Sequence, residues 1–434
     1  MKKFTRFIRT IPVILFCICV FNAMGQNVGT LIPPSLQNEF SLNQVETHYL
    51  PHSGKDIQST NNGKEGTPLW AGFSIKTEIS LSTEGTIVRW PNGEVSWIAR
   101  ITSPGAPALG LVMEQASFPA NATLYIYSEF DHSMIYSMNY EEISSGFIST
   151  PSLPTESLIV EYTEKGAGES FKGSFVITDL IVIYNGLEAA FGTKDLGDAE
   201  WCQVNINCSP EGDNWQLYKR GIARMLFREG SYWYYCTGTL INNTNQDGTP
   251  YFLTAEHCGG SASAADRNVW QFYFNYERPG CPNTGTPPTN LRTGCVLKAK
   301  GLISGGSDFQ LVQLNSAPPQ AWNPYYNGWD RNTTPATGGV GIHHPSGDAK
   351  KISTYTGTLT SASPNIGGSQ MASNSAWRVV WTQTANGHGC TEGGSSGSPI
   401  FNNAGLVVGT LSGGSSYCSS PSNPDYYGFE GELQ

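Results

Sequence analysis

The segment Gly393–Ile400 reads Gly-Gly-Ser-Ser-Gly-Ser-Pro-Ile and lies near the C-terminal end of the sequence. Glycine tolerates positive φ and has no side chain, so such a run lets the backbone turn sharply and lets a ligand approach it closely. A serine in this kind of turn can present its hydroxyl outward beside converging backbone N–H groups, which is the arrangement of a nucleophile next to an oxyanion hole. Gly/Ser-rich turns are also common as plain surface loops, so the interpretation depends on the rest of the chain.

Two upstream segments support it. Tyr251–Cys258 places His257 at the end of an apolar, strand-like run, and Ser307–Leu311 places Asp308 at the start of another. The chain order is therefore histidine, aspartate and then Ser396, which is the order of the catalytic residues in chymotrypsin.

The same segment also fits the G-x-S-x-G elbow of α/β-hydrolases, with Ser395 as the nucleophile. That fold needs its histidine after the serine in sequence. The last histidine is His388, so the order of the residues excludes this alternative.

The 434 residues are enough for two or three domains. A basic start, an apolar run over 11–21 and the small-residue site Ala23-Met24-Gly25 predict a signal peptide at 1–25. We therefore expect a secreted protein, extracellular or on the cell surface. The net charge of −10 argues against nucleic acid or an anionic membrane as a partner, and we expect a monomer.

Ten cysteines divide the chain unevenly. Two lie in the signal, none lies between 26 and 201, and eight follow. An even number in an exported chain predicts disulfides rather than a zinc site at His257 and Cys258. The boundary predicts two domains, 26–194 and 195–434.

Composition and pattern predict an all-β protein. Residues 26–66 are rich in Asn, Gln, Ser and Pro and predict a loosely ordered leader. Over 67–187 we expect an antiparallel β-sandwich, with alternation at 73–81 and a hairpin turn at Asn92–Gly93. Short strand-like runs in the second domain predict a barrel or sandwich; they cover 232–241, 269–276, 309–314, 377–382 and 406–411.

Several separated motifs resemble the chymotrypsin-like serine proteases, and among them the bacterial lysyl endopeptidases. The motifs are Cys236–Ile241, Phe252–Cys258, Ser307–Phe309, Gly328–Arg331, Ile342–Pro345, Gly394–Pro399 and Asp425–Gly428. The resemblance covers 202–428. It implies a chymotrypsin-like double antiparallel β-barrel with trypsin-like serine protease activity at 195–434, preceded by a β-rich propeptide at 26–194. It implies no cofactor and no metal.

Carried over to this sequence, the resemblance makes His257 the general base, Asp308 the residue that orients it, and Ser396 the nucleophile. The backbone N–H groups of Gly394 and Ser396 form the oxyanion hole. The chemistry fits these roles, because a serine hydroxyl needs a base to take its proton as it attacks, and imidazole titrates near neutral pH.

The resemblance also implies three disulfides: Cys202–Cys418, Cys208–Cys281 and Cys236–Cys258. Cys295 and Cys390 lie outside the family pattern, and we expect them to form a fourth bridge.

In the family, an aspartate before a Tyr-Gly pair lies at the base of the specificity pocket, and Asp425 matches it. Ser412 and Gly413-Gly414 match the pocket wall. This implies cleavage after basic residues, with lysine preferred. The family has a histidine at Ser412 and a tryptophan partner for it, which this sequence lacks around 363–367, so a protease that cuts after arginine and lysine alike is the alternative.

Trypsin-like zymogens carry an aspartate before the nucleophile, where this sequence has Ser395. We therefore expect activation by removal of an inhibitory or folding-assisting N-terminal domain, with self-cleavage at Lys194-Asp195. The family also continues with a further strand and helix, whereas this sequence stops at Gln434, as an unusually short domain or a fragment would.

Two other functions fit some of these residues. His343-His344 with Asp348 has metal-ligating residue types, but adjacent histidines on a strand point to opposite faces. A catalytically silent secreted binding protein with a protease-like domain is the rival of a different class, and the intact triad argues against it.

Overall fold

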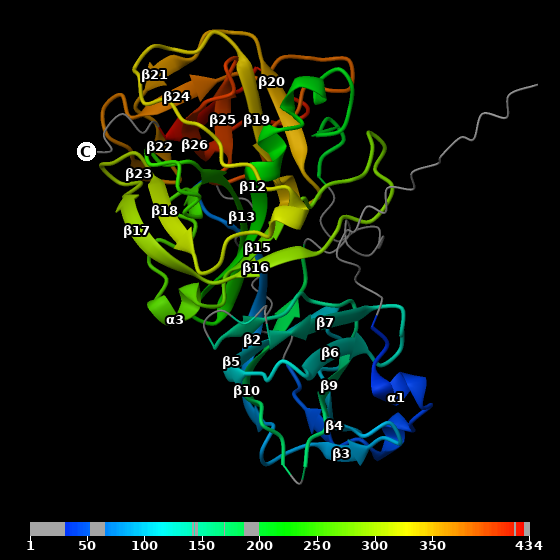
Figure 1. Ribbon diagram of the computed structural model, residues 1–434. Coiled ribbons are helices and arrows are strands. Elements are labelled where there is room, and N and C mark those ends of the chain that lie inside the picture. Colours follow the sequence, from blue (N-terminus) through cyan, green and yellow to red (C-terminus); the bar gives the residue numbers. More distant parts are fainter. Residues whose placement is uncertain are drawn as a thin grey trace, which may run out of the picture.

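The computed structural model describes residues 31–52, 66–140, 143, 146–168, 170–185, 199–420 and 422–428. The predicted signal peptide at 1–25 and the predicted cleavage site at Lys194-Asp195 lie outside these residues. The described chain is mostly β, in two lobes formed by its N-terminal and C-terminal halves (Figure 1). Within the described residues, helices are short, and none has the length and apolar character needed to cross a membrane.

The elements of the N-terminal half are α1 (Pro34–Gln37), η1 (Leu42–Gln44), β1 (Thr47–Tyr49), β2 (Leu69–Ser80), β3 (Thr86–Arg89), β4 (Glu94–Thr102), β5 (Ala108–Ser117), β6 (Ala122–Ser128), β7 (Ile135–Asn139), β8 (Ile148–Ser149), β9 (Ser157–Lys165) and β10 (Ser174–Ile183).

The elements of the C-terminal half are β11 (Val204–Asn205), η4 (Asp213–Trp215), η5 (Tyr218–Gly221), β12 (Ile222–Glu229), β13 (Tyr232–Ile241), β14 (Tyr251–Thr254), α3 (Ala264–Arg267), β15 (Gln271–Phe274), β16 (Asn290–Thr293), β17 (Cys295–Gly301), β18 (Phe309–Leu314), η6 (Gln320–Trp322), β19 (Gly339–His343), η7 (Pro345–Gly347), β20 (Lys351–Tyr355), β21 (Thr360–Ala362), β22 (Asn365–Ile366), β23 (Ser369–Gln370), β24 (Ala376–Val379), β25 (Pro399–Asn402), β26 (Val407–Gly414) and β27 (Asp425–Gly428).

The N-terminal half is a β-sandwich, as predicted. One sheet runs β1-β4-β9-β6-β7 with β3 beside β4, and the other contains β2, β10, β5 and β8. Apolar side chains from both sheets, among them Trp97, Leu111 and Leu180, form its core. The predicted turn at Asn92–Gly93 is confirmed, because β3 and β4 pair through Arg89 and Val95 on either side of it.

The prediction of a loosely ordered leader is wrong for residues 31–52. Strand β1 pairs in parallel with β4, and α1 is held by the side chain of Ser35, which contacts Tyr127 and Glu161 inside the lobe. Scattered apolar residues, including Phe40 and Val45, pack on a small core beneath. The prediction rested on the Asn- and Gln-rich composition of this segment, which does not reveal that a few of its residues pack on the lobe.

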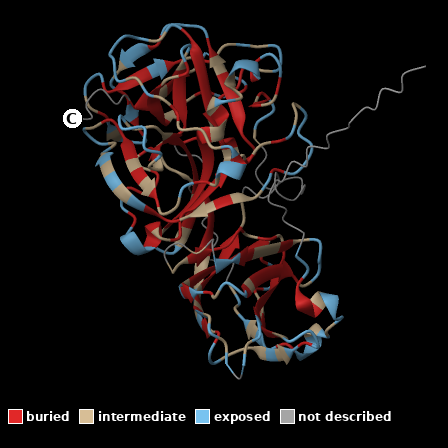
Figure 2. Cartoon of the chain, in the orientation of Figure 1, coloured by how far each residue is buried: buried red, intermediate tan, exposed pale blue. Residues whose placement is uncertain are grey.

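The C-terminal half contains two antiparallel sheets, one buried cluster joins residues of both, and the predicted all-β class is confirmed. The first comprises β12 to β18, and the second runs β11-β20-β19-β25-β26-β27-β24-β21. The expected runs at 232–241 and 309–314 coincide with β13 and β18. Figure 2 shows buried residues along the strands of both halves.

The two halves share one sheet, which the sequence did not predict. Strand β2 pairs antiparallel with β13, from Tyr232–Phe73 to Tyr235–Leu69, so β10, β2 and β13 lie side by side (Figure 1). A buried cluster crosses the junction and includes Ala71 of one half and Trp233 of the other. The sandwich therefore covers an edge of the C-terminal half.

Three of the expected disulfides are present, namely Cys202–Cys418, Cys208–Cys281 and Cys236–Cys258. The expected fourth bridge is wrong, because Cys295 and Cys390 are both buried free thiols. Cys295 lies in the core of the first sheet, and Cys390 lies in a separate cluster with Cys202 and Cys418. Two cysteines in different cores cannot meet the short Cα separation that a disulfide requires.

Candidate active site

Strand pairing brings His257 and Asp308 together. Strand β14 pairs with β18, with Thr254 opposite Gln310, and the backbone contact continues past the strand ends as Glu256 N–H donates to the carbonyl of Asp308. The Cys236–Cys258 bridge ties the residue after His257 to β13. Strand pairing and a disulfide therefore hold His257 next to Asp308, the two residues that the sequence analysis pairs.

One carboxylate binds the histidine twice. His257 Nδ1 lies 2.8 Å from Asp308 Oδ2, and His257 N–H donates to Asp308 Oδ1 at 3.0 Å. The aspartate is fully buried and the histidine side chain is 6 % exposed. Because a carboxylate only accepts, Nδ1 carries the proton in the neutral ring and Nε2 presents a lone pair. Within the described residues Nε2 has no hydrogen-bond partner.

Burial and the carboxylate act in opposite directions on this imidazole. Burial disfavours the charged form, but the Asp308 charge and its hydrogen bond outweigh burial, with a contribution from Glu256, and the pKa of His257 is raised. The ring is thus arranged to accept a proton and to be stabilised once it has done so.

The glycine turn packs directly on the end of β14. Gly397 has φ of +77°, and a Cβ there would lie 2.1 Å from Thr254 Oγ1 and 2.5 Å from the carbonyl of Thr237. Only glycine fits such a position. This contact places Ser396 beside the segment that leads to His257, and Ser396 lines a cavity.

Gly394 is similarly constrained. Its φ is +92°, and a Cβ there would lie 2.8 Å from the carbonyl of His344 and 2.9 Å from the backbone nitrogen of Gly347. Thr237 Oγ1 donates to the carbonyl of Gly394 at 2.8 Å and fixes the turn. In the part of the chain that the structure describes, the N–H groups of Gly394 and Ser396 donate to no other protein group. Free N–H groups in such a turn are suited to bind an oxyanion.

Ser395 is held by a buried histidine. Its Oγ lies 2.7 Å from His343 Nδ1 and accepts from the backbone N–H of Glu392, while His343 Nε2 contacts Ser353 Oγ. Burial, helped by the charge of Lys351, lowers the pKa of His343 to about 3, so the ring is neutral. The position before Ser396 is therefore fixed without an ion pair.

The hydrogen bonds of His343 and His344 argue against a metal site at these histidines. Both ring nitrogens of His343 are engaged, and His344 Nδ1 lies 2.9 Å from the carbonyl of Asp348. Among the described residues, one group of metal-type ligands is close enough to bind an ion. It consists of Cys202, Cys390 and Cys418, and two of these are joined in a disulfide.

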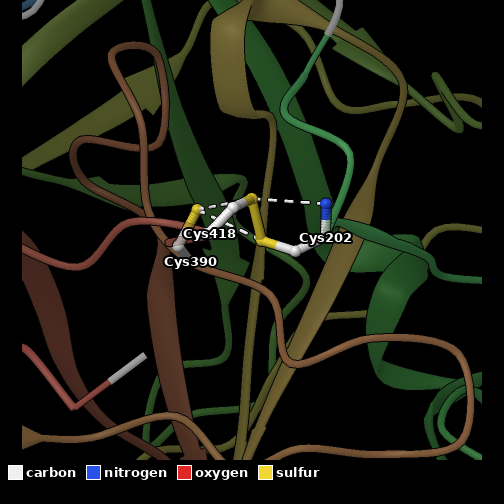
Figure 3. Close-up of side chains that lie close together, drawn as sticks. All are labelled: Cys202, Cys390 and Cys418. Atoms are coloured by element: carbon white, nitrogen blue, oxygen red, sulfur yellow. Dashed lines mark hydrogen bonds between the residues drawn. A yellow bond between two sulfur atoms is a disulfide. The ribbon is translucent and has the colours of Figure 1, made fainter. Parts of the chain in front are cut away.

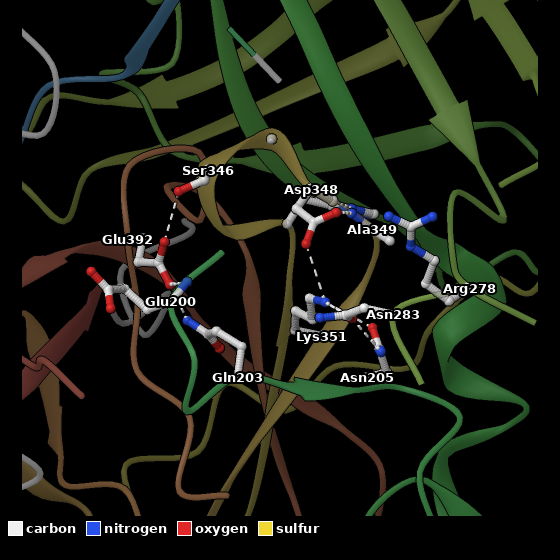
Figure 4. Close-up of polar contacts among 12 residues, drawn as sticks. Glu200, Gln203, Asn205, Arg278, Asn283, Ser346, Asp348, Ala349, Lys351 and Glu392 are labelled. Carbon is white, nitrogen blue, oxygen red and sulfur yellow. Dashed lines mark hydrogen bonds and ion pairs between the residues drawn. The ribbon is translucent and has the colours of Figure 1, made fainter. Parts of the chain in front are cut away.

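Glu392 connects the glycine turn that holds Ser396 to the start of the C-terminal half (Figure 4). Its carboxylate accepts from Ser346 Oγ at 2.7 Å, from the backbone N–H of Glu200 at 3.0 Å and from the side chain of Gln203. Burial raises the pKa of Glu392 against the effect of these donors. The segment 200–203 and the turn before Ser396 are thus fixed to each other.

A cavity of about 330 Å³ lies beside Ser396. It is lined by residues 390–393, Ser396, Leu411, Gly413, Gly414 and 416–419, by Glu200 and Trp201, and by Gly66 and Thr67 of the N-terminal half. The structure therefore brings the predicted pocket residues Gly413 and Gly414 to the same cavity as the predicted nucleophile. Ser412 is buried behind this wall, with its Oγ unpartnered among the described residues.

Asp425 lies behind this wall and is fully buried. Its Oδ2 accepts from Trp381 Nε1 and from Ser416 Oγ, both at 2.6 Å, and its Oδ1 accepts from the backbone N–H of Ser416 at 3.2 Å. Burial raises the pKa of Asp425, while the donors Ser416, Trp381 and Thr391 act to lower it. No ion pair to Asp425 occurs within the described residues.

Sequence reasoning missed the residues that support this site. Trp381 and Ser416 hold Asp425, His343 holds Ser395, and Thr67 reaches the cavity from the other lobe. Each acts across a sheet or between lobes, so no local spacing reveals it. His343 lies in the Ile342–Pro345 motif of the family resemblance, but nothing in the sequence indicates that its ring contacts Ser395.

Comparison with known proteins identifies the class. The family profile described as "Lysyl endopeptidase, C-terminal domain" matches residues 196–428. A lysyl endopeptidase of Pseudomonas aeruginosa is 28% identical over 392 residues, which cover 84% of this chain and 79% of that protein. The protein is a serine endopeptidase, which contradicts the alternative interpretation as a catalytically silent binding protein. The chain belongs to the lysyl endopeptidase family.

Solved structures resemble the C-terminal half at low identity. The protease Anisep from Arthrobacter nicotinovorans is 19% identical with a TM-score of 0.35, over 48% of this chain and 90% of that chain. A thermostable serine protease from an extremophilic microorganism is 16% identical with a TM-score of 0.31, over 49% of this chain and 92% of that chain.

Proposed function

We propose that this protein cleaves peptide bonds after lysine, with His257, Asp308 and Ser396 as its catalytic triad. The observation that carries the proposal is the short His257–Asp308 contact, which leaves His257 Nε2 without a hydrogen-bond partner among the described residues, while the turn that holds Ser396 packs on Thr254 and Ala255 just before His257. A base with a free lone pair next to a serine in a constrained glycine turn is the arrangement that nucleophilic acyl transfer requires.

Each residue then has a defined role in the reaction. Ser396 Oγ attacks the carbonyl carbon as His257 Nε2 takes its proton, and Asp308 stabilises the imidazolium. The N–H groups of Gly394 and Ser396 bind the developing oxyanion. His257 returns the proton to the leaving amine, and water then releases the acyl group from Ser396 by the same steps.

Asp425 supports the preference for lysine. A buried carboxylate with only neutral donors is costly, and a substrate ammonium group would relieve that cost. The wall in front of it is made by Gly413, Gly414 and Ser416, and all three line the cavity that Ser396 also lines. An arginine side chain would reach the same carboxylate. The ratio of cleavage after lysine to cleavage after arginine is therefore one of the results that a protein digestion measures.

The N-terminal domain, 26–194, fits the role of an inhibitor and folding partner. Gly66 and Thr67 line the cavity that contains Ser396, and β2 extends the sheet of the catalytic half. A substrate would have to displace these residues. We propose that the secreted chain loses residues 1–25 on export and is then cut at Lys194-Asp195, and three disulfides agree with an oxidising compartment.

Covalent labelling tests the nucleophile. The secreted wild-type chain would be treated with a fluorophosphonate, which phosphonylates activated serines, and the label would be mapped by mass spectrometry. We expect one label, on Ser396, absent in Ser396→Ala and retained in Ser398→Ala, a matched change of a buried serine in the same turn. A label that persists in Ser396→Ala would refute the assignment.

A further inference from the structure

The sulfur atoms of Cys202, Cys390 and Cys418 lie close together (Figure 3). Cys202 and Cys418 form a disulfide, and the free thiol of Cys390 lies 3.8 Å from Cys202 Sγ and 3.9 Å from Cys418 Sγ. All three side chains are buried together. A free thiol in van der Waals contact with a disulfide is placed for thiol–disulfide exchange.

We propose that Cys390 exchanges with this disulfide, so that a Cys202–Cys390 bridge forms and Cys418 becomes the free thiol. The exchange rests on the sulfur positions alone and does not depend on the proposed function.

The step balances without an external oxidant or reductant. Cys390 loses its proton, and its sulfur attacks Cys202 Sγ. The new S–S bond forms as the Cys202–Cys418 bond breaks, and Cys418 leaves with the electron pair and takes up one proton. The thiol is nearly equidistant from the two sulfurs, so its side chain must rotate to come into line with the bond before attack.

Hydrogen bonds select Cys418 as the leaving group. The backbone N–H of Cys202 points at Cys418 Sγ at 3.2 Å and would stabilise a thiolate there, and leaving is faster for a stabilised thiolate. On the attacking side, Gln203 Nε2 donates to Cys390 Sγ at 3.4 Å, and Glu392 Oε1 lies 4.0 Å away as an acceptor for the proton.

The surroundings make the exchange dependent on pH. Burial raises the pKa of the Cys390 thiol, and the carboxylates of Glu392, Asp425 and Glu200 raise it further, while a backbone contact at Cys418 acts the other way. The attacking thiolate is therefore scarce at neutral pH. The exchange should be slow there and should accelerate as the pH rises.

The exchange would change how the cavity wall is held. Cys390 and Cys418 both line the cavity with Ser396, and Cys202 lies near the start of the catalytic half. In the Cys202–Cys418 isomer, the bridge holds the loop that follows Gly414. In the Cys202–Cys390 isomer, it holds the loop that leads to Ser396. Only this consequence for activity rests on the proposed function.

The test follows the bridge directly. The full chain carrying Ser396→Ala, to prevent self-cleavage, would be held in mildly alkaline buffer, quenched in acid, digested with pepsin and mapped without reduction. Thiols stay protonated in acid, so the distribution at quenching is preserved. We expect a Cys202–Cys390 peptide that grows with time to a plateau. Cys390→Ser should abolish it, and Cys295→Ser, a matched change of the other buried thiol, should leave it unchanged.

Three results would overturn the proposal. In the first, Cys202–Cys418 is the sole linked form of these three cysteines at every time. In the second, a Cys390–Cys418 peptide appears in place of Cys202–Cys390, which would show that the other sulfur is attacked. In the third, a folded Cys418→Ser protein leaves Cys202 and Cys390 as two thiols, whereas we expect them to form the bridge.

Discussion

His257 Nδ1 lies 2.8 Å from Asp308 Oδ2, while the backbone N–H of the same histidine binds the other oxygen of that carboxylate at 3.0 Å. The aspartate thus sets both the tautomer of the ring and the course of the backbone that carries it. Asp308 itself has φ of +58°, a sparsely populated conformation for a residue other than glycine. Its carbonyl accepts from the backbone N–H of Glu256, and its own N–H donates to the carbonyl of Leu302; these two hydrogen bonds hold it in this conformation.

Replacing Asp308 by asparagine should lower kcat by about 10⁴-fold, because the amide permits the wrong imidazole tautomer. The measurement is steady-state hydrolysis of a lysyl peptide, beside Asp247→Asn, an exposed aspartate whose change should have no effect. A loss of less than about tenfold would contradict the role of Asp308 as the orienting residue.

The same pair sets the pH dependence. The base works only when His257 is neutral, and Asp308 raises the pKa of His257, so activity is lost as the pH falls through a value above the ordinary histidine range. In Asp308→Asn the carboxylate charge is gone, and the midpoint of the acid limb of kcat/KM should move to lower pH. A limb that stays in place would show that another group controls it.

Asp425 and Trp381 should control selectivity. Asp425→Asn removes the charge that an ammonium group meets, a loss of about 3 kcal/mol or ~10²-fold in kcat/KM for lysyl over norleucyl substrates. Trp381→Phe removes one hydrogen bond to the carboxylate, worth roughly tenfold in the same ratio. Trp329→Phe, whose indole donates to a backbone carbonyl elsewhere, is the matched control. If the ratio of lysyl to norleucyl kcat/KM is unchanged in Asp425→Asn, Asp425 does not contribute to the specificity pocket.

Gly394→Ala tests the oxyanion turn. The new Cβ would collide with the backbone of His344 and Gly347, so the turn must move, and losing one oxyanion donor costs about 10²–10³ in kcat with little change in KM. Gly248→Ala is the control, since Gly248 also has positive φ but has open space around it. An effect on KM alone would argue against an oxyanion role.

The shared sheet predicts that the two halves stay together after the chain between them is cut. Besides β2–β13, Asp179 of the sandwich lies 3.3 Å from Arg228 of the C-terminal half, and the Asp179 side chain is fully buried. A specific protease site placed within 186–198 would be cleaved, and both fragments should elute as one species on gel filtration. Separate elution of the two fragments without denaturant would contradict this prediction.

Local pattern was enough for much of this fold. The alternation at 73–81 and the apolar run at 309–314 place strands because each depends on side chains a few residues apart. The pairing of β2 with β13 joins two strand edges that lie about 160 residues apart in sequence. No local sequence pattern predicts such a pairing.

The candidate site also contains features that the sequence predicts and features that it does not. The order of His257, Asp308 and Ser396 was readable from sequence, and so were three disulfides through a family resemblance. The partner of Cys390 was not, because pairing the two leftover cysteines ignores where each is buried. Cys295 lies in the core of the first sheet, and Cys390 instead contacts an existing bridge.

The most direct test is to digest a denatured protein mixture with the secreted wild-type protein and with Ser396→Ala, and to read every cleavage site by mass spectrometry. The account predicts cuts almost wholly after lysine, all absent in Ser396→Ala. Cuts that persist in that variant, or Ser396-dependent cuts that ignore the residue before the bond, would contradict it.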